Sequence, residues 1–231
     1  MQCLQLTRGE PTATIDVIFA NNSWEEIIAA CQSGNVPDTW VVGNSKTMTI
    51  NRTSYQIDII GKKHDAYTAG GTAPLTFQMH DCYAKTYTMN SSGTNEGGWT
   101  SCVMRNTHLP AILALMPTEV QNGIREVNKM TSAGNQSSTI NTTADKLFLL
   151  SEIEVFGSVT YSVSGEGVQY AYYSAGNSKV KKSTTYGYSA VWWERSPRRD
   201  DSACFCAVSD IGVAEYYNAD NTPGVAFCFC F

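Results

Sequence analysis

The last residues of the chain alternate between large apolar and small side chains. A period of two is typical of a β-strand, whose successive side chains point to opposite faces. We therefore predict a terminal strand in which one face carries Val225, Phe227, Phe229 and Phe231 and the other carries Ala226, Cys228 and Cys230. A second strand is predicted to begin at Trp192, where two tryptophans and an arginine combine large apolar area with one fixed charge.

A helical pattern follows Ser23 near the start of the chain. Ser23 and Glu26 have the spacing of a capping box, in which each side chain binds a free amide of the first turn. Apolar residues then recur at helical spacing, which predicts one buried face: Trp24, Ile27, Ile28 and Cys31. Gly34 and Pro37 are expected to end this helix.

Short strands are predicted for most of the remaining apolar segments. Residues 47–50 and 55–60 are expected to form a hairpin around Asn51 and Arg52, and 75–79 a further strand. Earlier, 2–6 and 13–19 alternate well enough to be strands, and later 124–130 and 146–150 have strand character. A second helical segment is expected through Ser101, Met104 and Arg105, and helix-like apolar spacing resumes between Leu109 and Leu115, with Pro110 and Pro117 in first-turn positions. Residues 131–143 are predicted to be a polar loop.

Together these elements predict an α+β protein, with two main helices and several short, mostly antiparallel strands joined by long loops. The chain has 231 residues, of which 42% are hydrophobic and 16% charged, so a proper core is expected. Its net charge of -5 implies no basic face, and we therefore expect no nucleic-acid partner. No apolar run approaches membrane-spanning length, and no signal peptide is recognisable.

Eight cysteines are present, but a chain with a normal apolar fraction and no export signal does not need a disulfide frame. We expect mostly reduced, partly buried thiols. The pairs Cys204/Cys206 and Cys228/Cys230 could form a four-sulfur metal site if they lay on neighbouring strands. Structural zinc prefers a longer turn between paired ligands, so buried small residues are the favoured interpretation and no metal or other cofactor is predicted.

Catalytic chemistry is not indicated by the three histidines. His64 and His80 each precede an aspartate, yet adjacent residues rarely point at one target, and no nucleophile motif accompanies them. His108 is expected at a helix end. The pairs Trp99/Arg105 and Trp193/Arg195 are predicted to be core, with Arg195 held by Glu194 or Glu154. We therefore predict that the protein is not an enzyme.

Fewer types of amino acid occur near the C-terminal end of the chain than elsewhere. From Pro197 to Phe231 there is no Lys, Gln, Met or Trp, and the single Glu is Glu215. Codons that end in a pyrimidine encode every residue type except Lys, Gln, Glu, Met and Trp. Randomised codons of that kind would leave this composition, although Glu215 departs from it.

With these features the segment from Trp192 to Phe231 resembles the variable region of proteins diversified by diversity-generating retroelements. The matching residues are 192–197 (Trp-Trp-Glu-Arg-Ser-Pro), Gly212 and 224–227 (Gly-Val-Ala-Phe). In that family, mutated copies of a template are written into the end of a target gene, and the variable region closes a C-type-lectin-like fold. The resemblance covers about residues 20–231 and is specific only at 192–231, with 1–19 as an N-terminal strand segment or junction.

What the resemblance implies is a C-type-lectin-like domain with a diversified binding surface. It assigns a structural role to Trp192, Trp193, Arg195, Gly212, Gly224 and Phe227. It assigns ligand binding to the residues between, where Tyr and Arg would be the strongest anchors: Arg198, Arg199, Asp200, Asp201, Ala203, Ala207, Ser209, Asp210, Ile211, Val213, Tyr216, Tyr217, Asp220, Asn221 and Thr222.

The expected partner is a cell-surface protein or glycan of a bacterial host, bound by a phage or prophage tail adhesin or by a bacterial surface protein. A homo-oligomer is expected, with a trimer favoured over a dimer. Two alternatives remain open: an oxidoreductase of the formylglycine-generating type, and a carbohydrate-binding module without diversification. The latter would be calcium-independent, because no set of residues fixes enough oxygens around one calcium ion.

Overall fold

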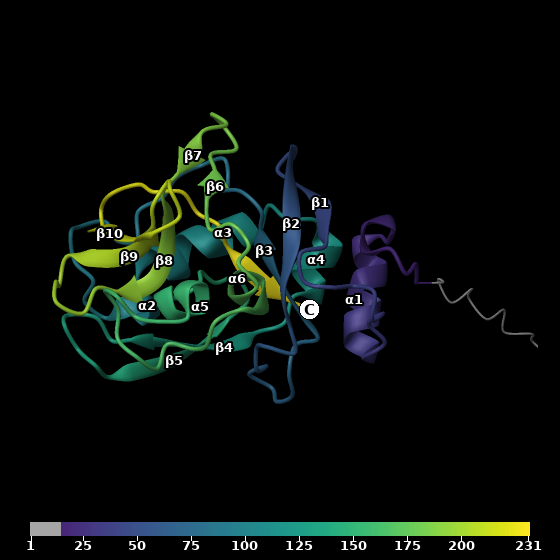
Figure 1. The fold of residues 1–231 in the computed structure, drawn as a ribbon, viewed down its shortest axis with the longest axis horizontal. Helices are drawn as coiled ribbons and strands as arrows, with labels where there is room; N and C mark the ends of the chain where they lie inside the picture. The colour runs from purple at the N-terminus through teal and green to yellow at the C-terminus, as the bar shows by residue number, and fades with distance from the viewer. Residues whose placement is uncertain (1–14) are drawn as a thin grey trace, which may run out of the picture.

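The structure, a computed structural model, describes residues 15–231. Helices and antiparallel strands are mixed along this part of the chain, so the predicted α+β class is confirmed (Figure 1). Among the described residues, no helix is both long and apolar enough to cross a membrane.

The largest sheet combines strands from the two ends of the described chain. Its order is β1-β2-β3-β11, with every neighbouring pair antiparallel. At the β1–β2 turn, Asn51 and Arg52 have φ values of 46° and 67°, as in the tight hairpin turns that match strand twist. The predicted hairpin and terminal strand are thereby confirmed. The four strands are β1 (Ser45–Ile50), β2 (Thr53–Lys62), β3 (Leu75–Met79) and β11 (Cys228–Cys230).

Helix α1 (Trp24–Ser33) has the predicted capping box and packs against this sheet. The backbone N–H of Glu26 donates to Ser23 Oγ at 3.1 Å, and that of Ser23 donates to Glu26 Oε2 at 2.7 Å. The Trp24 ring meets Phe229 and Phe231 at centroid distances of 6.5 and 6.0 Å. The beginning and the end of the described chain therefore share one aromatic core.

A second sheet has the order β10-β9-β8 and lies on the side of the molecule away from α1 (Figure 1). It consists of β8 (Trp192–Pro197), β9 (Cys204–Val208) and β10 (Ala214–Asn218). Every residue of β8 and β9 is buried, whereas β10 is partly or fully exposed. A parallel bridge between Trp192 and Gly224 connects this sheet to the segment that leads into β11.

The remaining elements surround the two sheets. Two further antiparallel pairs are β4 (Val127–Ser132) with β5 (Ile140–Asp145), and β6 (Lys181–Lys182) with β7 (Ser189–Ala190). The short helical segments are η1 (Phe19–Asn21, 3-10), α2 (Gly98–Ser101), η2 (Met104–His108, π-helical), α3 (Leu109–Leu113), α4 (Thr118–Gly123), α5 (Glu152–Phe156) and α6 (Ala171–Ser174). The helical structure predicted after Thr100 is thus present as several short pieces.

The strand predicted for 13–19 is wrong where the structure describes it. Asp16 instead forms a local turn: its carboxylate accepts the Ile18 N–H at 2.7 Å and the Asn21 side-chain amide at 3.0 Å. These short-range bonds replace a strand ladder and lead into η1. The segment 2–6 lies outside the described residues, and the boundary at residue 19 stays a prediction.

Two predictions in the middle of the chain are also wrong. The polar stretch 131–143 is not a loop throughout, because β4 runs to Ser132 and β5 starts at Ile140. Thr142 and Thr143 fit strand geometry since threonine is β-branched. Residues 146–150 are largely buried, yet they form no strand of their own. Phe148 makes a bridge to Cys228, and the Leu150 carbonyl accepts the Arg195 N–H at 2.7 Å.

Candidate binding surface

Strand β8 is anchored by the guanidinium of Arg195, which is fully buried. Arg195 binds both carboxylate oxygens of Glu154 on α5, with Nη2 at 3.0 Å from Oε1. Its partner is therefore Glu154 rather than Glu194, the other predicted candidate. The remaining N–H groups donate to Thr131 Oγ1 and to the carbonyls of Leu149, Met130 and Glu166. Because each guanidinium nitrogen is paired, Arg195 fixes β8 to three other segments.

The ion pair continues inward as a buried network. Lys129 Nζ lies 2.7 Å from Glu154 Oε1 and 2.8 Å from Asp65 Oδ1, and the Tyr170 hydroxyl donates to Asp65 at 2.8 Å. Burial alone would raise the pKa of Asp65, but the charge of Lys129 together with hydrogen bonds from Lys129 and Thr76 outweighs it and lowers that pKa to about 2. Four charged groups thus neutralise one another in a network that reaches from Arg195 on β8 to Asp65, which accepts the Thr76 hydroxyl of β3.

Glu194, the neighbour of Arg195, has a different environment. Both of its carboxyl oxygens are buried and have no hydrogen-bond partner among the described residues. Burial, with Glu152 and Glu166 nearby, raises its pKa well above the usual range. Burial also raises the pKa of Glu166 to about 7, although Ser196 donates to it. The carboxyl group of Glu194 on β8 therefore favours the protonated form, and the pKa of Glu166 beside it is shifted in the same direction.

The other predicted structural residues, except Gly212, also lie in the interior. Trp192, Trp193 and Phe227 are fully buried, and the two indole N–H groups donate to the carbonyls of Lys179 and Tyr87. A Cβ on Gly224 would lie 2.5 Å from Cys82 Sγ, so only glycine fits there. Gly212 is partly exposed, and its φ of +81° favours glycine.

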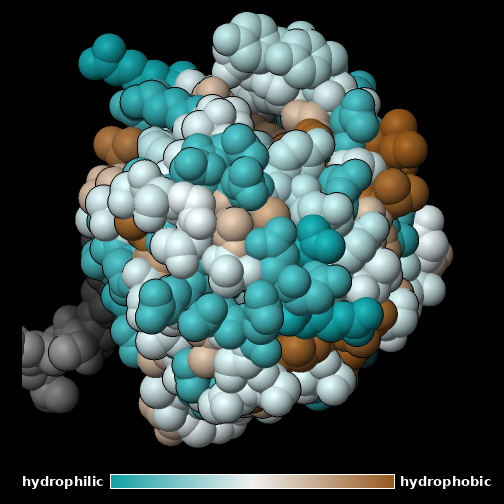
Figure 2. All heavy atoms as spheres, turned by 90° about the vertical axis from the view of Figure 1, so that its left-hand side faces the viewer, coloured by the Kyte–Doolittle hydropathy of each residue, from teal (hydrophilic) through white to brown (hydrophobic). Residues whose placement is uncertain are grey.

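Most of the predicted binding positions lie at the surface, on three connected segments. Residues 198–203 join β8 to β9, 209–213 join β9 to β10, and 219–222 follow β10. Figure 2 shows the side of the molecule that carries this sheet, with hydrophilic residues across much of its middle. Fully exposed are Arg199, Asp200, Asp210, Ile211, Val213, Asp220, Asn221 and Thr222; partly exposed are Arg198, Asp201, Ala203, Tyr216 and Tyr217.

Two positions assigned to ligand binding are buried, which corrects that assignment. Ala207 pairs with Trp193 across β8 and β9 and is 0% exposed. Ser209 accepts the Val213 N–H on its hydroxyl at 3.1 Å and closes the β9–β10 turn. Both residues therefore belong to the framework, because β9 is covered on both faces.

The loop 198–203 is held by Asn95, a residue outside the C-terminal stretch that the sequence analysis did not identify. Asn95 is fully buried, and its side-chain amide donates to the carbonyls of Asp201 and Cys204, each at 2.7 Å. Its backbone N–H donates to the carbonyl of Ser202 at 2.7 Å. Because these bonds end on main-chain groups, they do not depend on which side chains the loop carries.

Arg198 and Tyr216 form the best-ordered side-chain cluster on this surface. The Arg198 guanidinium lies 3.6 Å from the Tyr216 ring centroid and pairs with Asp200 at 2.6 Å. Tyr161, which the sequence analysis missed, packs edge-on against Tyr216 at 4.9 Å. The cluster offers a charged plane and two aromatic rings at a partly exposed site, the side-chain types that anchor protein interfaces.

A groove of about 590 Å³ lies at the edge of this surface. Asp210 and Thr222 of the predicted binding set contribute to its lining. Lys85, Tyr186 and Tyr188 also line it and were not among the residues predicted from the sequence. The only local signal was a Tyr-Gly-Tyr sequence in a polar loop. The groove requires segments about a hundred positions apart to meet.

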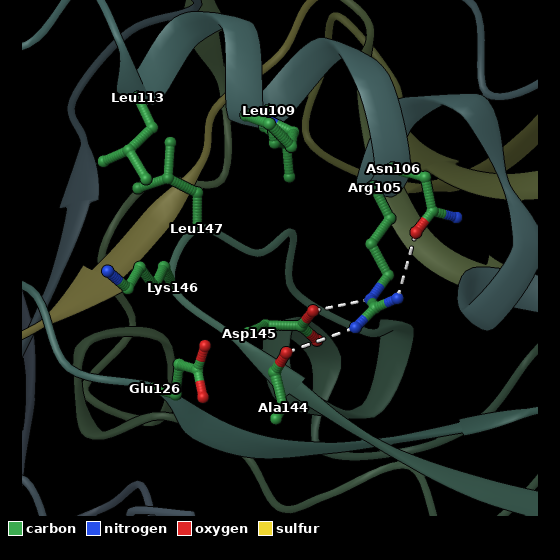
Figure 3. Close-up of a pocket in the computed structure, with 10 residues that line it drawn as sticks. Arg105, Asn106, Leu109, Leu113, Glu126, Ala144, Asp145, Lys146 and Leu147 are labelled. Carbon is green, nitrogen blue, oxygen red and sulfur yellow. Dashed lines mark hydrogen bonds and ion pairs between the residues drawn. The ribbon is translucent and has the colours of Figure 1, made fainter.

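A separate groove of about 270 Å³ lies between α3 and β5 (Figure 3). At one end Arg105 pairs with Asp145 at 2.6 Å and donates to the Ala144 carbonyl. The Trp99 indole donates to the same carboxylate at 2.9 Å. The predicted Trp99/Arg105 core pair is thus connected through Asp145, and the polar groups at this end of the groove bind one another.

The cysteines and histidines occupy structural positions. Cys204 and Cys206 lie on β9 and the pair Cys228/Cys230 on β11, in different sheets, and no three His, Cys, Asp or Glu side chains in 15–231 are grouped to hold a metal. The seven cysteines in that range are buried thiols that form no disulfide with one another, and burial raises the pKa of Cys204 to about 11. His80 pairs with Asp58 at 2.7 Å rather than with the adjacent Asp81. His64 stacks on Tyr170.

The fold and this surface define an α+β protein with a buried ionic framework and a polar, aromatic loop face. A family model described as "Domain of unknown function (DUF6273)" matches residues 75–230, and the chain belongs to this family. The match runs from β3 to the end of β11 and includes the whole candidate surface. No curated protein and no solved structure gives a match.

Proposed function

We propose that this protein binds a ligand through a C-terminal surface that a retroelement diversifies. The observation that carries the proposal is the way in which the loops are held. Asn95 binds backbone groups of residues 201–204, and the carbonyl of Ala203 accepts the Ala219 N–H at 2.9 Å. A surface supported through its main chain accepts changes in side chains, which a diversified binding protein requires.

The arrangement of the other residues supports the same proposal. The positions predicted to vary are exposed or partly exposed except Ala207 and Ser209, while Trp192, Arg195 and Phe227 are fully buried. The pyrimidine-codon alphabet covers the stretch in which this division occurs. Substitution at exposed positions usually changes stability by less than about 0.5 kcal/mol, so variation there is compatible with one fold.

We further propose that the α+β fold is C-type-lectin-like. Two features support this: β11 lies beside strands of the first third of the chain, and Trp24 of α1 packs on Phe231. The ends of the described chain thus meet, and a loop-rich face lies away from them (Figure 1). A solved structure of the protein that shares this topology with C-type lectins would establish the point.

The proposed partner is a cell-surface protein or glycan of a bacterial host, and the proposed location is a virion tail or a bacterial surface. A homo-oligomer, with a trimer favoured, fits the exposed apolar side chains near the start of the described chain. Val17 and Ile18 are 61% and 58% exposed and line a groove of about 350 Å³. Sedimentation as a monomer at micromolar concentration would contradict the oligomer.

The alternative oxidoreductase of the formylglycine-generating type receives less support. Its chemistry would need reactive cysteines, and the thiolate is the reactive form. Cys228 and Cys230 are fully buried, and burial raises the pKa of both thiols well above the usual range. These properties fit packing in β11 better than they fit catalysis.

The proposal is tested by the DNA around the gene. We expect a reverse-transcriptase gene nearby, together with a second copy of the 192–231 coding region that differs from the first at adenines of the template. Sequences from independent isolates should vary between codons 198 and 222 and keep Trp193, Arg195 and Gly224. If no second copy exists and isolates are invariant across 198–222, the diversification proposal is wrong.

A further inference from the structure

Two exposed tyrosines form a stacked pair on the loop between β6 and β7. Tyr186 is 71% exposed and Tyr188 61%. Their ring centroids are 5.5 Å apart and their planes differ by 7°, which is an offset parallel stack. The hairpin that carries them projects from the top of the molecule in Figure 1, and pale side chains of intermediate hydropathy form the top of the surface in Figure 2. A large area of aromatic surface is thus exposed to solvent.

The pair sits on a well-ordered support. Within the loop, the Ser183 N–H donates to the Tyr188 carbonyl at 2.9 Å and the Gly187 N–H to the Ser183 carbonyl at 2.7 Å. The Thr185 hydroxyl donates to the Ala84 carbonyl at 2.8 Å and ties the loop to the neighbouring segment. Because these bonds fix the backbone on both sides of the rings, little conformational entropy is lost when a ligand packs on them.

The tyrosines border the groove of about 590 Å³ described above. Its other polar lining consists mainly of hydroxyl groups, with one ammonium group from Lys85 and one carboxylate from Asp210. Its aliphatic side chains are small, since they come from alanine, Val191 and Pro223. Besides the stacked pair, the hydroxyl-bearing residues are Tyr83, Thr86, Ser183, Thr185, Ser189 and Thr222.

This lining distinguishes between classes of ligand. A peptide helix needs deep apolar pockets for its anchors, which Val191 and alanine do not provide. A nucleic acid or phosphate group needs a cluster of cations, and Lys85 is the one cation in the lining. A sugar ring combines an apolar face of C–H groups with a rim of hydroxyls. The C–H groups pack on the electron-rich face of an aromatic ring, and hydroxyl side chains both donate to and accept from the rim.

We propose that this groove binds a saccharide, with a pyranose ring packed on the Tyr186/Tyr188 pair and its hydroxyls bonded to the groove. Both tyrosines lie outside the stretch predicted to vary, whereas Asp210 and Thr222 lie inside it. The tyrosine platform therefore sets the ligand class, and the two variable residues select among saccharides. This selection rests on the proposed function; the platform itself does not.

The test is binding of the purified protein to an array of gluco-, galacto-, manno- and N-acetylglucosamine oligosaccharides, followed by titration of the best hit. We expect at least one saccharide to bind. Substitution of both Tyr186→Ala and Tyr188→Ala should weaken it at least about tenfold, since such anchors carry much of the binding free energy. The double Tyr→Phe variant keeps the ring faces and should retain most of the affinity. Val168→Ala, which shortens an exposed side chain outside this groove, is the control and should bind as the parent does.

Because both tyrosines are exposed, the double Ala variant should melt with the parent, which separates binding from folding. Absence of any bound saccharide, or an unchanged Kd in the double Ala variant, would overturn the proposal. The variants Asp210→Asn and Thr222→Ala address the dependence on diversification. If these variants keep the saccharide preference of the parent, the stacked tyrosines remain the binding site, but Asp210 and Thr222 do not select the saccharide. A coding region that is invariant across codons 198–222 would instead contradict only the proposed diversification.

Discussion

Two arginines three positions apart show how differently the two parts of the C-terminal stretch are built. Arg195 is 0% exposed and binds Glu154, Thr131 and several carbonyls, so it connects β8 to elements distant in the sequence. Arg198 is partly exposed and binds its near neighbour Asp200 and the ring of Tyr216. The same side chain thus serves as a structural tie in one place and as a surface group in the other.

The difference teaches that burial and partner distance decide the role of a residue here. Removing a buried charge leaves its partners unpaired in a medium of low polarity, which is costly. Removing a surface charge exposes its partners to water, which replaces the lost bonds. The framework of β8 and β11 should therefore be intolerant to substitution, and the loops between them tolerant.

The largest expected effect is that of Arg195→Met. It leaves the Glu154 carboxylate without one of its two cations and several carbonyls without donors, so unfolding should become easier by about 3–5 kcal/mol. Arg195→Lys keeps the charge but loses the planar fork, and should fall between parent and Met variant. Denaturant unfolding measures both. Arg198→Met is the matched control and should shift the midpoint by a small fraction of that amount. Equal shifts at the two arginines would remove the distinction between the regions.

A smaller effect of opposite sign is expected for Glu194→Gln. The folded protein raises the pKa of Glu194, so the group contributes fully to stability below its unfolded pKa of about 4.3, and this contribution is lost as pH rises toward the folded pKa. Stability of the parent should therefore fall as the pH rises from about 5 into the neutral and mildly alkaline range. The Gln variant should fall less and be more stable at the upper pH by about 1–3 kcal/mol.

Thermal unfolding across this pH range measures the effect. Glu215→Gln, on the partly exposed strand β10, is the control and should follow the parent curve. Glu166, with a pKa raised to about 7, should retain some pH dependence in the Glu194→Gln variant. A variant that loses stability as steeply as the parent would show that Glu194 is not the protonated group.

The smallest effect is expected on the loop face. Each exposed position should change stability by less than about 0.5 kcal/mol. The six changes together therefore stay below about 3 kcal/mol, or about 6–12 °C in Tm, and changes of opposite sign should keep the combined shift well below that bound. Phe227→Ser, a single change at a fully buried site, should lower the Tm further than all six together. Calorimetry of both proteins checks the order. The six changes are Arg199→Ser, Asp210→Asn, Ile211→Thr, Asp220→Asn, Asn221→Ser and Thr222→Ala.

The sequence predicted those elements whose structure depends on residues only a few positions apart. The capping box at Ser23, the turn at Asn51 and the alternation from Val225 to Phe231 each act within a few residues, and each is confirmed. The turn at Asp16 was missed although its bonds are local, because alternation over 13–19 suggested a strand. The β4–β5 hairpin was also missed, because the polar composition of residues 131–143 suggested a loop.

The candidate surface was predicted only in part because its supports come from distant segments. Asn95 contacts residues about a hundred positions away. Lys85 and Asp210 line the same groove only because folding brings their segments together. Ala207 and Ser209 were assigned to binding because the resemblance gives the extent of the variable region but not the burial of each position. A strand covered on both faces, as β9 is, does not reveal itself through alternation.

The most direct test of the central claim is a saturation substitution library of Asn95 and residues 192–231, with folding measured by resistance to protease. The account predicts that most substitutions are tolerated at Arg199, Ile211, Asp220 and Asn221, and that few are tolerated at Asn95, Trp193, Arg195, Gly224 and Phe227. Equal tolerance at the two sets of positions, or tolerance at Arg195 with intolerance at Asn221, would contradict the division between a buried framework and a variable surface.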